Sequence, residues 1–211
     1  MNHGFGSMIQ NLKNDPKTIV FPEGSDPRIL EAASRLLAGT FLTPILLGKT
    51  EEIQEAAERE GFNIRGARII EPQKYERFED MVQLFCEIRK EKGISSEQAR
   101  EILSGENYFG TMLIKMGEAD CLLGGATYST ADTVRPALQI IKTKPGNRIV
   151  SSCFILVRPS VTGDDQVIAM ADCAINIHPT EEDLVEICGE TARCAKSFGI
   201  KSLLAQCWLA C

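Results

Sequence analysis

One short stretch of this sequence carries the residue types from which an anion site can be built. Residues 122–143 read LLGGATYSTADTVRPALQIIKT, an apolar run followed by two glycines, several hydroxyl residues and a helix-like pattern that contains Arg135. At the end of a parallel strand, a glycine such as Gly125 allows a tight turn, and a hydroxyl at Ser129 or Thr130 can cap the following helix. The helix N-terminus and the arginine fork both suit phosphate oxygens. The pattern predicts a phosphate or acyl phosphate ligand, although these features are structural in many α/β domains.

Two further features bear on this hypothesis. Pro136 follows the arginine and removes one helix hydrogen bond, so the helix is either kinked there or begins later than Ser129. The segment FPEGSDP forms a second candidate loop at a strand end, with Ser25 or Asp26 as the helix cap. From its residues alone, this second loop is as much a structural turn as a substrate-facing one.

Composition excludes several classes of protein. The chain has 211 residues and a formal net charge of −6, so it carries no basic footprint for nucleic acid or for an anionic membrane. The first residues lack an apolar leader, and no run of apolar residues is long enough to span a membrane, so we expect a cytoplasmic protein. Eight cysteines without a C-x-x-C pair indicate reduced, mostly buried thiols. With only His3 and His178, we expect neither a histidine-based metal cage nor a Ser-His-Asp triad.

Strand-like and helix-like patterns alternate through the first two thirds of the chain. The strand-like runs lie at 18–22, 44–48, 67–72 and 120–125, and the helical patterns at 29–37, 51–61, 74–92 and 95–118. Parallel strands need a crossover, which a helix supplies, so the alternation predicts an open, mostly parallel α/β sheet with helices on both faces. Ser95 and Gln98 fit a capping box at the start of the last of these helices.

The pattern changes after Pro145-Gly146-Asn147. Two β-rich runs, 148–157 and 167–177, are joined by the turn residues 162–165 and predict an antiparallel hairpin. Thr180 is expected to cap a helix that ends at Phe198, and a strand-like run begins at Lys201. We therefore predict a first α/β domain over residues 1–145 and an incomplete second α/β domain over residues 146–211.

Four segments resemble the phosphate acetyltransferase (phosphotransacetylase) family. They read FPEGSDPRILEAA, YFGTMLIKMGEADCLLGGA, STADTVRPALQIIKT and ADCAINIHPTEEDL, and the resemblance covers residues 16–200. It implies reversible transfer of an acetyl group between CoA and phosphate, an enzyme of acetate metabolism, in a cleft between two α/β domains. It further implies acetyl-CoA and phosphate as small-molecule substrates, no metal, no permanently bound cofactor, and a homodimer in the full-length family.

The resemblance also implies two catalytic arginines. They match Arg89, in LFCEIRKEKG, and Arg135, in STADTVRPA. Acyl transfer between a thiol and phosphate develops anionic charge that preorganised guanidinium groups can stabilise. An arginine between Glu87 and Glu91 on a helix is, however, also typical of a solvated surface charge. Ser129, Thr130 and Gly125 are the expected substrate-binding residues.

Members of that family continue into the rest of the second domain and a segment that returns to the first. That segment carries the serine, arginine and aspartate assigned to CoA binding and thiol deprotonation, and no residue here matches them. The last residues, KSLLAQCWLAC, resemble the family poorly, as in a truncated or frameshifted sequence. We expect this chain alone to be inactive or nearly so. The alternatives are a non-catalytic anion-binding α/β remnant, a phosphate butyryltransferase-like enzyme, or a regulatory domain like that fused to some malic enzymes.

Overall fold

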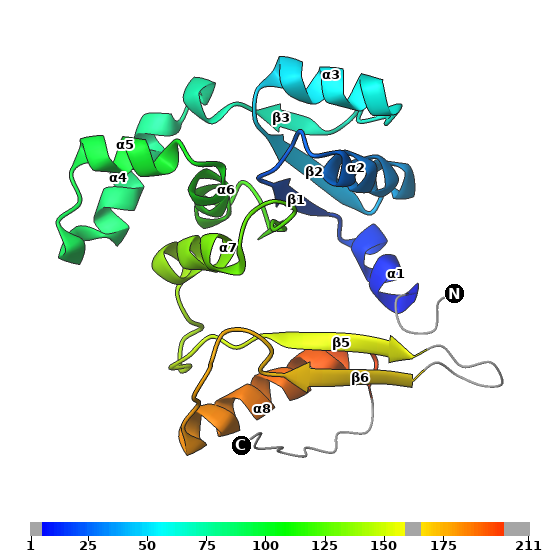
Figure 1. Cartoon of the computed structure of the whole chain (residues 1–211), viewed down its shortest axis with the longest axis vertical. Helices are drawn as coiled ribbons and strands as arrows, with labels where there is room; N and C mark the ends of the chain where they lie inside the picture. Colours follow the sequence, from blue (N-terminus) through cyan, green and yellow to red (C-terminus); the bar gives the residue numbers. More distant parts are fainter. Residues whose placement is uncertain (1–5, 159–165, 201–211) are drawn as a thin grey trace. The chain divides into compact units, whose positions relative to one another are not determined.

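The computed structural model describes residues 6–158 and 166–200. The described residues divide into two compact units, one of residues 12–142 and one that combines residues 6–11 with 143–158 and 166–200. Figure 1 labels the helices and strands. Up to residue 142 they are, in chain order, α1 (Gly6–Asn14), β1 (Lys17–Phe21), α2 (Pro27–Gly39), β2 (Leu42–Leu47), α3 (Thr50–Glu60), β3 (Arg68–Ile70), the 3-10 turn η1 (Pro72–Lys74), α4 (Phe78–Ile88), the 3-10 turn η2 (Lys90–Lys92), α5 (Ser96–Leu103), α6 (Glu106–Lys115), β4 (Cys121–Leu122), α7 (Thr130–Pro136) and the π-helical segment η3 (Ala137–Ile141).

The sheet of the 12–142 unit is parallel, as the alternating pattern predicts. Its strand order is β3-β2-β1-β4, and Val20 of β1 is in register with Ile45 on one side and with Leu122 on the other. β1 therefore lies inside the sheet, and the direction in which strands are added reverses between β1 and β4. In open α/β sheets such a reversal leaves a crevice outside the carboxyl ends of the strands, where ligands bind.

Both faces of this sheet are covered by helices. Successive strand side chains point to opposite faces, so Val20 and Leu47 pack with α4, α5 and α6, whereas Phe21 and Leu46 pack with α2 and α3. All four side chains are at most 1% exposed. Each contributes roughly 1.5–3 kcal/mol by leaving water. The apolar strands are buried on both sides, which holds their carboxyl ends, and the loops that follow them, in fixed positions.

The helical region between β3 and β4 is more divided than its sequence pattern predicts. The expected helix over 95–118 is two helices, α5 and α6, because Gly105 has an extended backbone and forms the N-cap of α6. The expected helix over 74–92 is confined to α4, flanked by η1 and η2. The capping box of Ser95 and Gln98 is confirmed, with a reciprocal pair of side-chain to backbone hydrogen bonds.

The smaller unit contains the predicted hairpin and helix. β5 (Cys153–Arg158) pairs antiparallel with β6 (Gln166–Ala171), and α8 (Glu181–Ser197) follows. The predicted turn at 162–165 and the strand-like run from Lys201 lie outside the described residues. Thr180 caps α8 as expected, with Asp183 completing a capping box.

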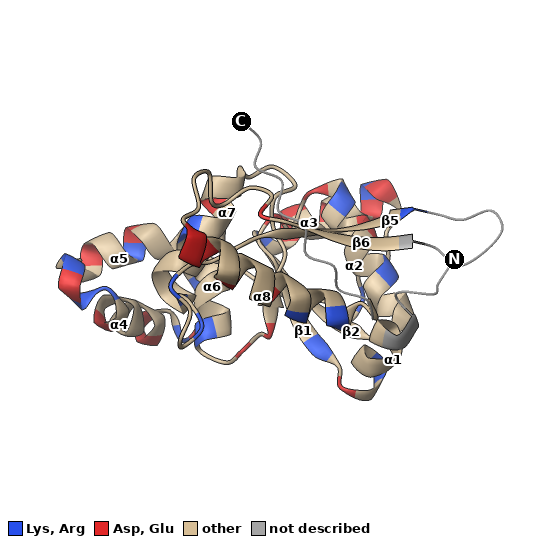
Figure 2. Ribbon diagram, turned by 90° about the horizontal axis from the view of Figure 1, so that it is seen from below, with Lys and Arg blue, Asp and Glu red and all other residues tan. Residues whose placement is uncertain are grey.

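The distribution of charged residues agrees with the composition of the sequence. Figure 2 shows acidic and basic positions interspersed along the elements of the 12–142 unit. No helix in the described ranges is long and apolar enough to cross a membrane. The six described cysteines are free, but the expectation that they are mostly buried is wrong: Cys121 and Cys188 are exposed and the other four are half-buried. A cysteine in an apolar strand or helix pattern can still lie on the open side of a hairpin or helix.

Candidate active site

Two loops meet at the carboxyl ends of β1 and β4, where the strand order reverses. The first begins at Pro22 and ends where α2 starts, and the second runs from Leu123 to Ser129. The first loop is anchored to β2, because the Gly24 N–H donates to the Leu47 carbonyl at 3.1 Å. A Cβ at Gly24 would lie 2.5 Å from that carbonyl oxygen, so only glycine fits this approach.

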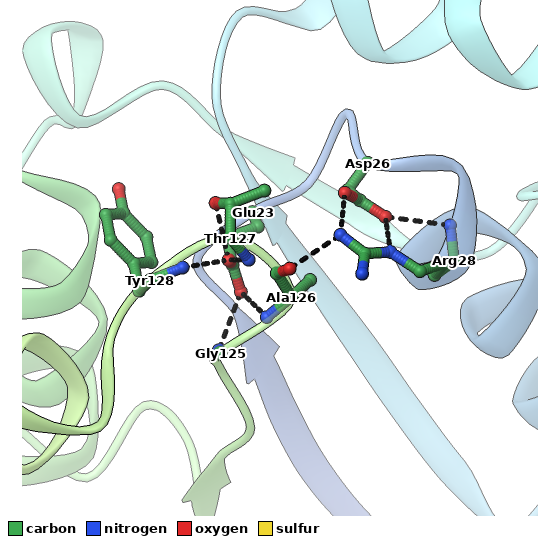
Figure 3. Close-up of polar contacts among 7 residues, drawn as sticks. All are labelled: Glu23, Asp26, Arg28, Gly125, Ala126, Thr127 and Tyr128. Atoms are coloured by element: carbon green, nitrogen blue, oxygen red, sulfur yellow. Dashed lines mark hydrogen bonds and ion pairs between the residues drawn. The ribbon is translucent and has the colours of Figure 1, made fainter.

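The carboxylate of Glu23 binds the tip of the second loop, as Figure 3 shows. Its Oε2 accepts hydrogen bonds from the backbone N–H of Gly125 at 2.8 Å and of Ala126 at 2.9 Å. Its Oε1 accepts from the Tyr128 N–H at 3.0 Å, from the Thr127 hydroxyl at 2.7 Å and from the Thr127 N–H. Burial acts to raise the pKa of Glu23, but these hydrogen bonds outweigh it and lower the pKa to about 2.

The anion at the glycine turn is thus a side chain of the protein. Gly125 has φ +106°, a conformation that favours glycine, and it begins a run of four N–H groups that converge on Glu23. Such a curved run of backbone donors is an anion-binding nest. The glycine turn is where the sequence analysis expects a phosphate or acyl phosphate to bind, and that expectation stays a prediction. The donors of this turn are engaged by Glu23, a residue that the sequence analysis did not single out.

Asp26 and Arg28 tie the same two loops together from outside. The Asp26 side chain caps α2 by accepting from the Arg28 N–H at 2.9 Å, which confirms one of the two caps expected for this turn. Its two oxygens also accept from the Arg28 guanidinium, at 2.9 and 2.7 Å. The same guanidinium donates to the Ala126 carbonyl at 2.6 Å. Arg28 thereby links the helix that follows β1 to the loop that follows β4, a role that its place in the sequence does not reveal.

Ser129 is the N-cap of α7. Its hydroxyl accepts from the Asp132 N–H at 3.2 Å and donates to the Asp132 carboxylate at 2.6 Å. Thr130 is the first helical residue, and its side chain is exposed. The structure therefore gives Ser129 a capping role, and its expected contact with substrate, like that of Thr130, stays a prediction.

Pro136 alters the helix in a way that recruits Asn107. A proline cannot donate to the carbonyl four residues earlier, which here belongs to Asp132. That carbonyl accepts instead from the Asn107 side-chain amide, at 3.3 Å. Beyond Pro136 the chain continues as π-helical η3, so the helix begins at the expected place and changes its winding at the proline.

Arg135 lies on α7 with its guanidinium largely in solvent. The side chain is 57% exposed, and within the described residues its ion pair is with Asp132, whose Oδ1 is 3.8 Å from Nη1. A separation of this length at an exposed site leaves the guanidinium weakly held. Its hydrogen-bond donors are therefore available to a ligand.

Arg89 is placed differently. It is the C-cap of α4 and is half-buried. Its Nε is buried and has no hydrogen-bond partner in the described part of the chain. An unpaired buried donor on a charged group is costly, and it is found where a ligand, water or ion completes the site. This placement does not fit a purely solvated surface arginine.

A cleft of about 360 Å³ opens beside the two loops. Its lining includes Glu23, Asp26, Glu52 and Glu106, and Lys49 is the one cation that the described part of the chain contributes to it. The Lys49 ammonium is paired with Glu52 at 2.7 Å. This lining is acidic, so it favours an anionic ligand only if further cations approach. Arg89 and Arg135 are not part of it.

A second cleft, of about 410 Å³, lies at the end of β3. Its basic residues are already paired, Arg77 with Glu118 at 2.8 Å and Lys74 with Glu71 at 2.8 Å. It therefore offers no advantage for phosphate over the loops at β1 and β4. No group of three or more His, Cys, Asp or Glu side chains within residues 6–158 and 166–200 is arranged to hold a metal ion.

The sequence of nearly the whole chain matches a known protein family. The profile of the phosphate acetyl/butaryl transferase family matches residues 5–206, and the chain belongs to this family. It is 49% identical over 201 residues to the phosphate acetyltransferase of Bacillus subtilis, covering 95% of this chain and 60% of that protein. It is 45% identical over 192 residues to that of Thermoanaerobacterium thermosaccharolyticum, covering 90% of this chain and 58% of that protein.

Solved structures of phosphotransacetylases are also similar to this chain. A phosphotransacetylase from Streptococcus pyogenes matches with a TM-score of 0.87 and 44% identity, covering 95% of this chain and 60% of that one. The EutD phosphotransacetylase from Staphylococcus aureus matches with a TM-score of 0.82 and 41% identity, covering 94% of this chain and 60% of that one. The chain thus spans about 60% of the length of these relatives.

Proposed function

We propose that this chain is part of a phosphate acetyltransferase that interconverts acetyl-CoA plus phosphate with CoA plus acetyl phosphate. The observation that carries the proposal is the 49% identity with the Bacillus subtilis phosphate acetyltransferase over 95% of the chain. The names of the relatives favour acetyl over butyryl as the transferred group. CoA is a substrate in this reaction, and we propose no permanently bound cofactor.

The proposed reaction needs cations that act on the transition state. A phosphate oxygen attacks the thioester carbonyl, and negative charge develops on the carbonyl oxygen as this bond forms. The charge then passes to the CoA sulfur as the C–S bond breaks. Preorganised donors aimed at this charge stabilise the transition state. We assign this role to Arg135 and Arg89. The exposed, weakly paired guanidinium of Arg135 and the unpartnered Nε of Arg89 support the assignment, as seen among the described residues.

Glu23 has a positioning role in this proposal. Its carboxylate fixes the tip of the Gly125–Tyr128 loop, which leads directly into the Ser129 cap of α7. α7 in turn carries Arg135. A buried carboxylate with several donors in place rigidifies the loop, so the start of α7 is set before substrate arrives. Gly125, Ser129 and Thr130 remain the proposed substrate-side residues of this turn.

A homodimer and a cytoplasmic location complete the proposal. Exposed apolar side chains on the β5–β6 hairpin support self-association, since Phe154 is 58% and Met170 53% exposed. The six described cysteines are free thiols, which supports a reducing compartment. Sedimentation of the chain and of a Phe154→Asp variant tests the dimer. A monomeric wild-type chain in the micromolar range would show that the exposed hairpin face does not drive self-association.

The function is tested with a hybrid enzyme. Residues 12–142, one compact unit, replace the matching part of the Bacillus subtilis phosphate acetyltransferase, and phosphate-dependent release of CoA from acetyl-CoA is measured. The proposal expects turnover within about tenfold of the parent enzyme, the cost of one imperfectly placed contact. A folded hybrid without phosphate-dependent turnover would contradict it.

A further inference from the structure

Two cysteine sulfurs are in contact between the hairpin and the helix of the smaller unit. Cys153 is the first residue of β5, and Cys194 lies in the last turn of α8. The Cys153 thiol donates a hydrogen bond to the Cys194 sulfur, and the two Sγ atoms are 3.5 Å apart. α8 packs against β6, the partner strand of β5. Figure 1 shows α8 lying along the hairpin.

The geometry of the pair is close to that of a disulfide. A disulfide holds its sulfurs at about 2 Å, so the two Sγ atoms need to approach by roughly 1.5 Å. Both residues lie near the end of an element, where backbone and side-chain adjustments meet less resistance than in its middle. Cys188, on the same helix, is exposed and has no such neighbour among the described cysteines.

We propose that Cys153 and Cys194 are a redox pair that low-molecular-weight disulfides oxidise to an intramolecular disulfide. The Cys194 thiolate attacks one sulfur of the small disulfide, which breaks the S–S bond, forms a mixed disulfide and releases one small thiol. Cys153 then attacks the Cys194 sulfur of that mixed disulfide and releases the second small thiol. The two protein thiols lose two electrons and two protons, and the small disulfide gains both.

The order of attack follows from the environment of Cys153. Burial, then the hydrogen bond to Cys194, raise the pKa of Cys153, which disfavours its thiolate until Cys194 has reacted and that hydrogen bond is gone. Cys194 is the hydrogen-bond acceptor and is the sulfur that attacks first. Once Cys194 is in the mixed disulfide, Cys153 is already within contact distance of the sulfur that it must attack.

A third thiol near the pair can compete. Cys173 follows β6 and also acts to raise the pKa of Cys153, and its own thiol donates to the Met170 carbonyl at 3.0 Å. Because that hydrogen bond directs the thiol to the backbone, we expect Cys173 to remain reduced while the pair closes. The bond between Cys153 and Cys194 would hold β5 to α8 across 41 positions of the sequence.

The test is a disulfide map of the 211-residue chain. The reduced protein is incubated with oxidised glutathione, the free thiols are alkylated, and peptides are analysed by mass spectrometry without reduction. The expected result is a Cys153–Cys194 peptide at least about tenfold more abundant than any other cysteine-linked peptide, lost on reduction. Cys207 and Cys211 lie outside the described residues, and the same map reads them separately.

Matched variants identify the roles. Cys188→Ser, on the same helix, should leave the crosslink unchanged. Cys194→Ser should abolish it and slow the reaction with oxidised glutathione at this site, whereas Cys153→Ser should trap Cys194 as a glutathione mixed disulfide. If the wild-type chain stays alkylated at both Cys153 and Cys194, or if Cys173 takes the place of either, the proposal is wrong. The wild-type map decides this even if a variant fails to fold.

Discussion

The carboxylate of Glu23 accepts a hydrogen bond from the Gly125 backbone N–H at 2.8 Å, although the two residues are 102 positions apart. Glu23 follows β1 and Gly125 follows β4, the two strands between which the order of the sheet reverses. In most open α/β sheets this place receives a ligand. Here an internal carboxylate occupies the donors of the turn and fixes the segment that leads into α7.

The hydrogen bonds of the Glu23 carboxylate predict a contribution to stability that is lost in acid. Glu23 is 8% exposed, and its pKa falls from 4.5 to about 2 on folding. A lowered pKa contributes stability that is complete above the unfolded value and is lost as the pH falls from about 4.5 to 2. The shift corresponds to about 3 kcal/mol. Urea unfolding of wild type and Glu23→Gln at pH 7, 4 and 2.5 should give curves that differ most at pH 7 and converge in acid.

The control for that experiment is Glu52→Gln, a carboxylate whose side chain is 58% exposed and paired with Lys49. It should change the unfolding midpoint little at any of these pH values. A Glu23→Gln difference that stays constant from pH 7 to 2.5 would show that the pKa of Glu23 does not change on folding.

The hydrogen bond from the Asn107 side chain predicts that substitutions at Asn107 and Pro136 have non-additive effects on stability. Asn107 satisfies the Asp132 carbonyl that Pro136 leaves without its helical donor. Asn107→Ala should lower the free energy of unfolding by about 0.5–1.5 kcal/mol, because the part-buried Asp132 carbonyl loses its donor. Pro136→Ala restores a backbone N–H that can donate to that carbonyl, so the cost of Asn107→Ala should be smaller in this background. Additive effects in this double-mutant cycle would disprove the link.

The fold of the 12–142 unit can be predicted from the sequence because the patterns that indicate it are local. Alternating strands and helices imply crossovers, crossovers imply parallel strands, and the caps at Ser95 and Ser129 can be recognised within a few residues of each helix. The Thr180 cap of the smaller unit is local in the same way. Helix boundaries are harder, since the break at Gly105 depends on one residue adopting an extended backbone.

The candidate site can be predicted only in part from the sequence, because its contacts join residues that lie far apart in the chain. The glycine turn and Arg135 are visible, but burial of Glu23 is favourable only because four N–H groups more than a hundred positions away converge on it. Arg28 likewise reaches Ala126 across 98 positions. One signal in the sequence was Glu23 itself. It is an acidic residue between the end of a buried strand and Gly24, where a carboxylate without a partner would not be stable.

Substitution of Arg89 should affect activity without lowering stability. Its buried Nε has no hydrogen-bond partner among the described residues, so Arg89→Met, which keeps the apolar stem, should leave the midpoint of unfolding unchanged or raise it. In the hybrid enzyme the same variant should lower turnover at least about tenfold, because a donor to the developing charge is lost. A lowered midpoint of unfolding together with unchanged turnover would assign Arg89 a structural role.

The 211-residue polypeptide by itself should show little acetyl-CoA-dependent phosphorolysis. It spans about 60% of the relatives that it matches. We propose that the segments found only in the relatives carry the group that moves the thiol proton. Loss of proton transfer alone removes a factor of about 10² to 10⁴. Phosphate-dependent CoA release by the purified chain is compared with that of the hybrid. Equal turnover by the two proteins would show that the segments found only in the relatives are dispensable.

The central claim is that Arg135 acts on the transition state of acyl transfer, and its turnover number in the hybrid enzyme tests this most directly. Arg135→Ala should lower the turnover number by about two orders of magnitude or more, near 3 kcal/mol, without changing the midpoint of unfolding. Arg135→Lys should recover part of the loss, because lysine offers a point charge and not a planar fork. Arg35→Ala, an exposed helix arginine paired with Glu31, is the control and should have no effect. Near-normal turnover of Arg135→Ala, with a lowered midpoint of unfolding, would contradict the account and leave Arg135 a structural brace of α7.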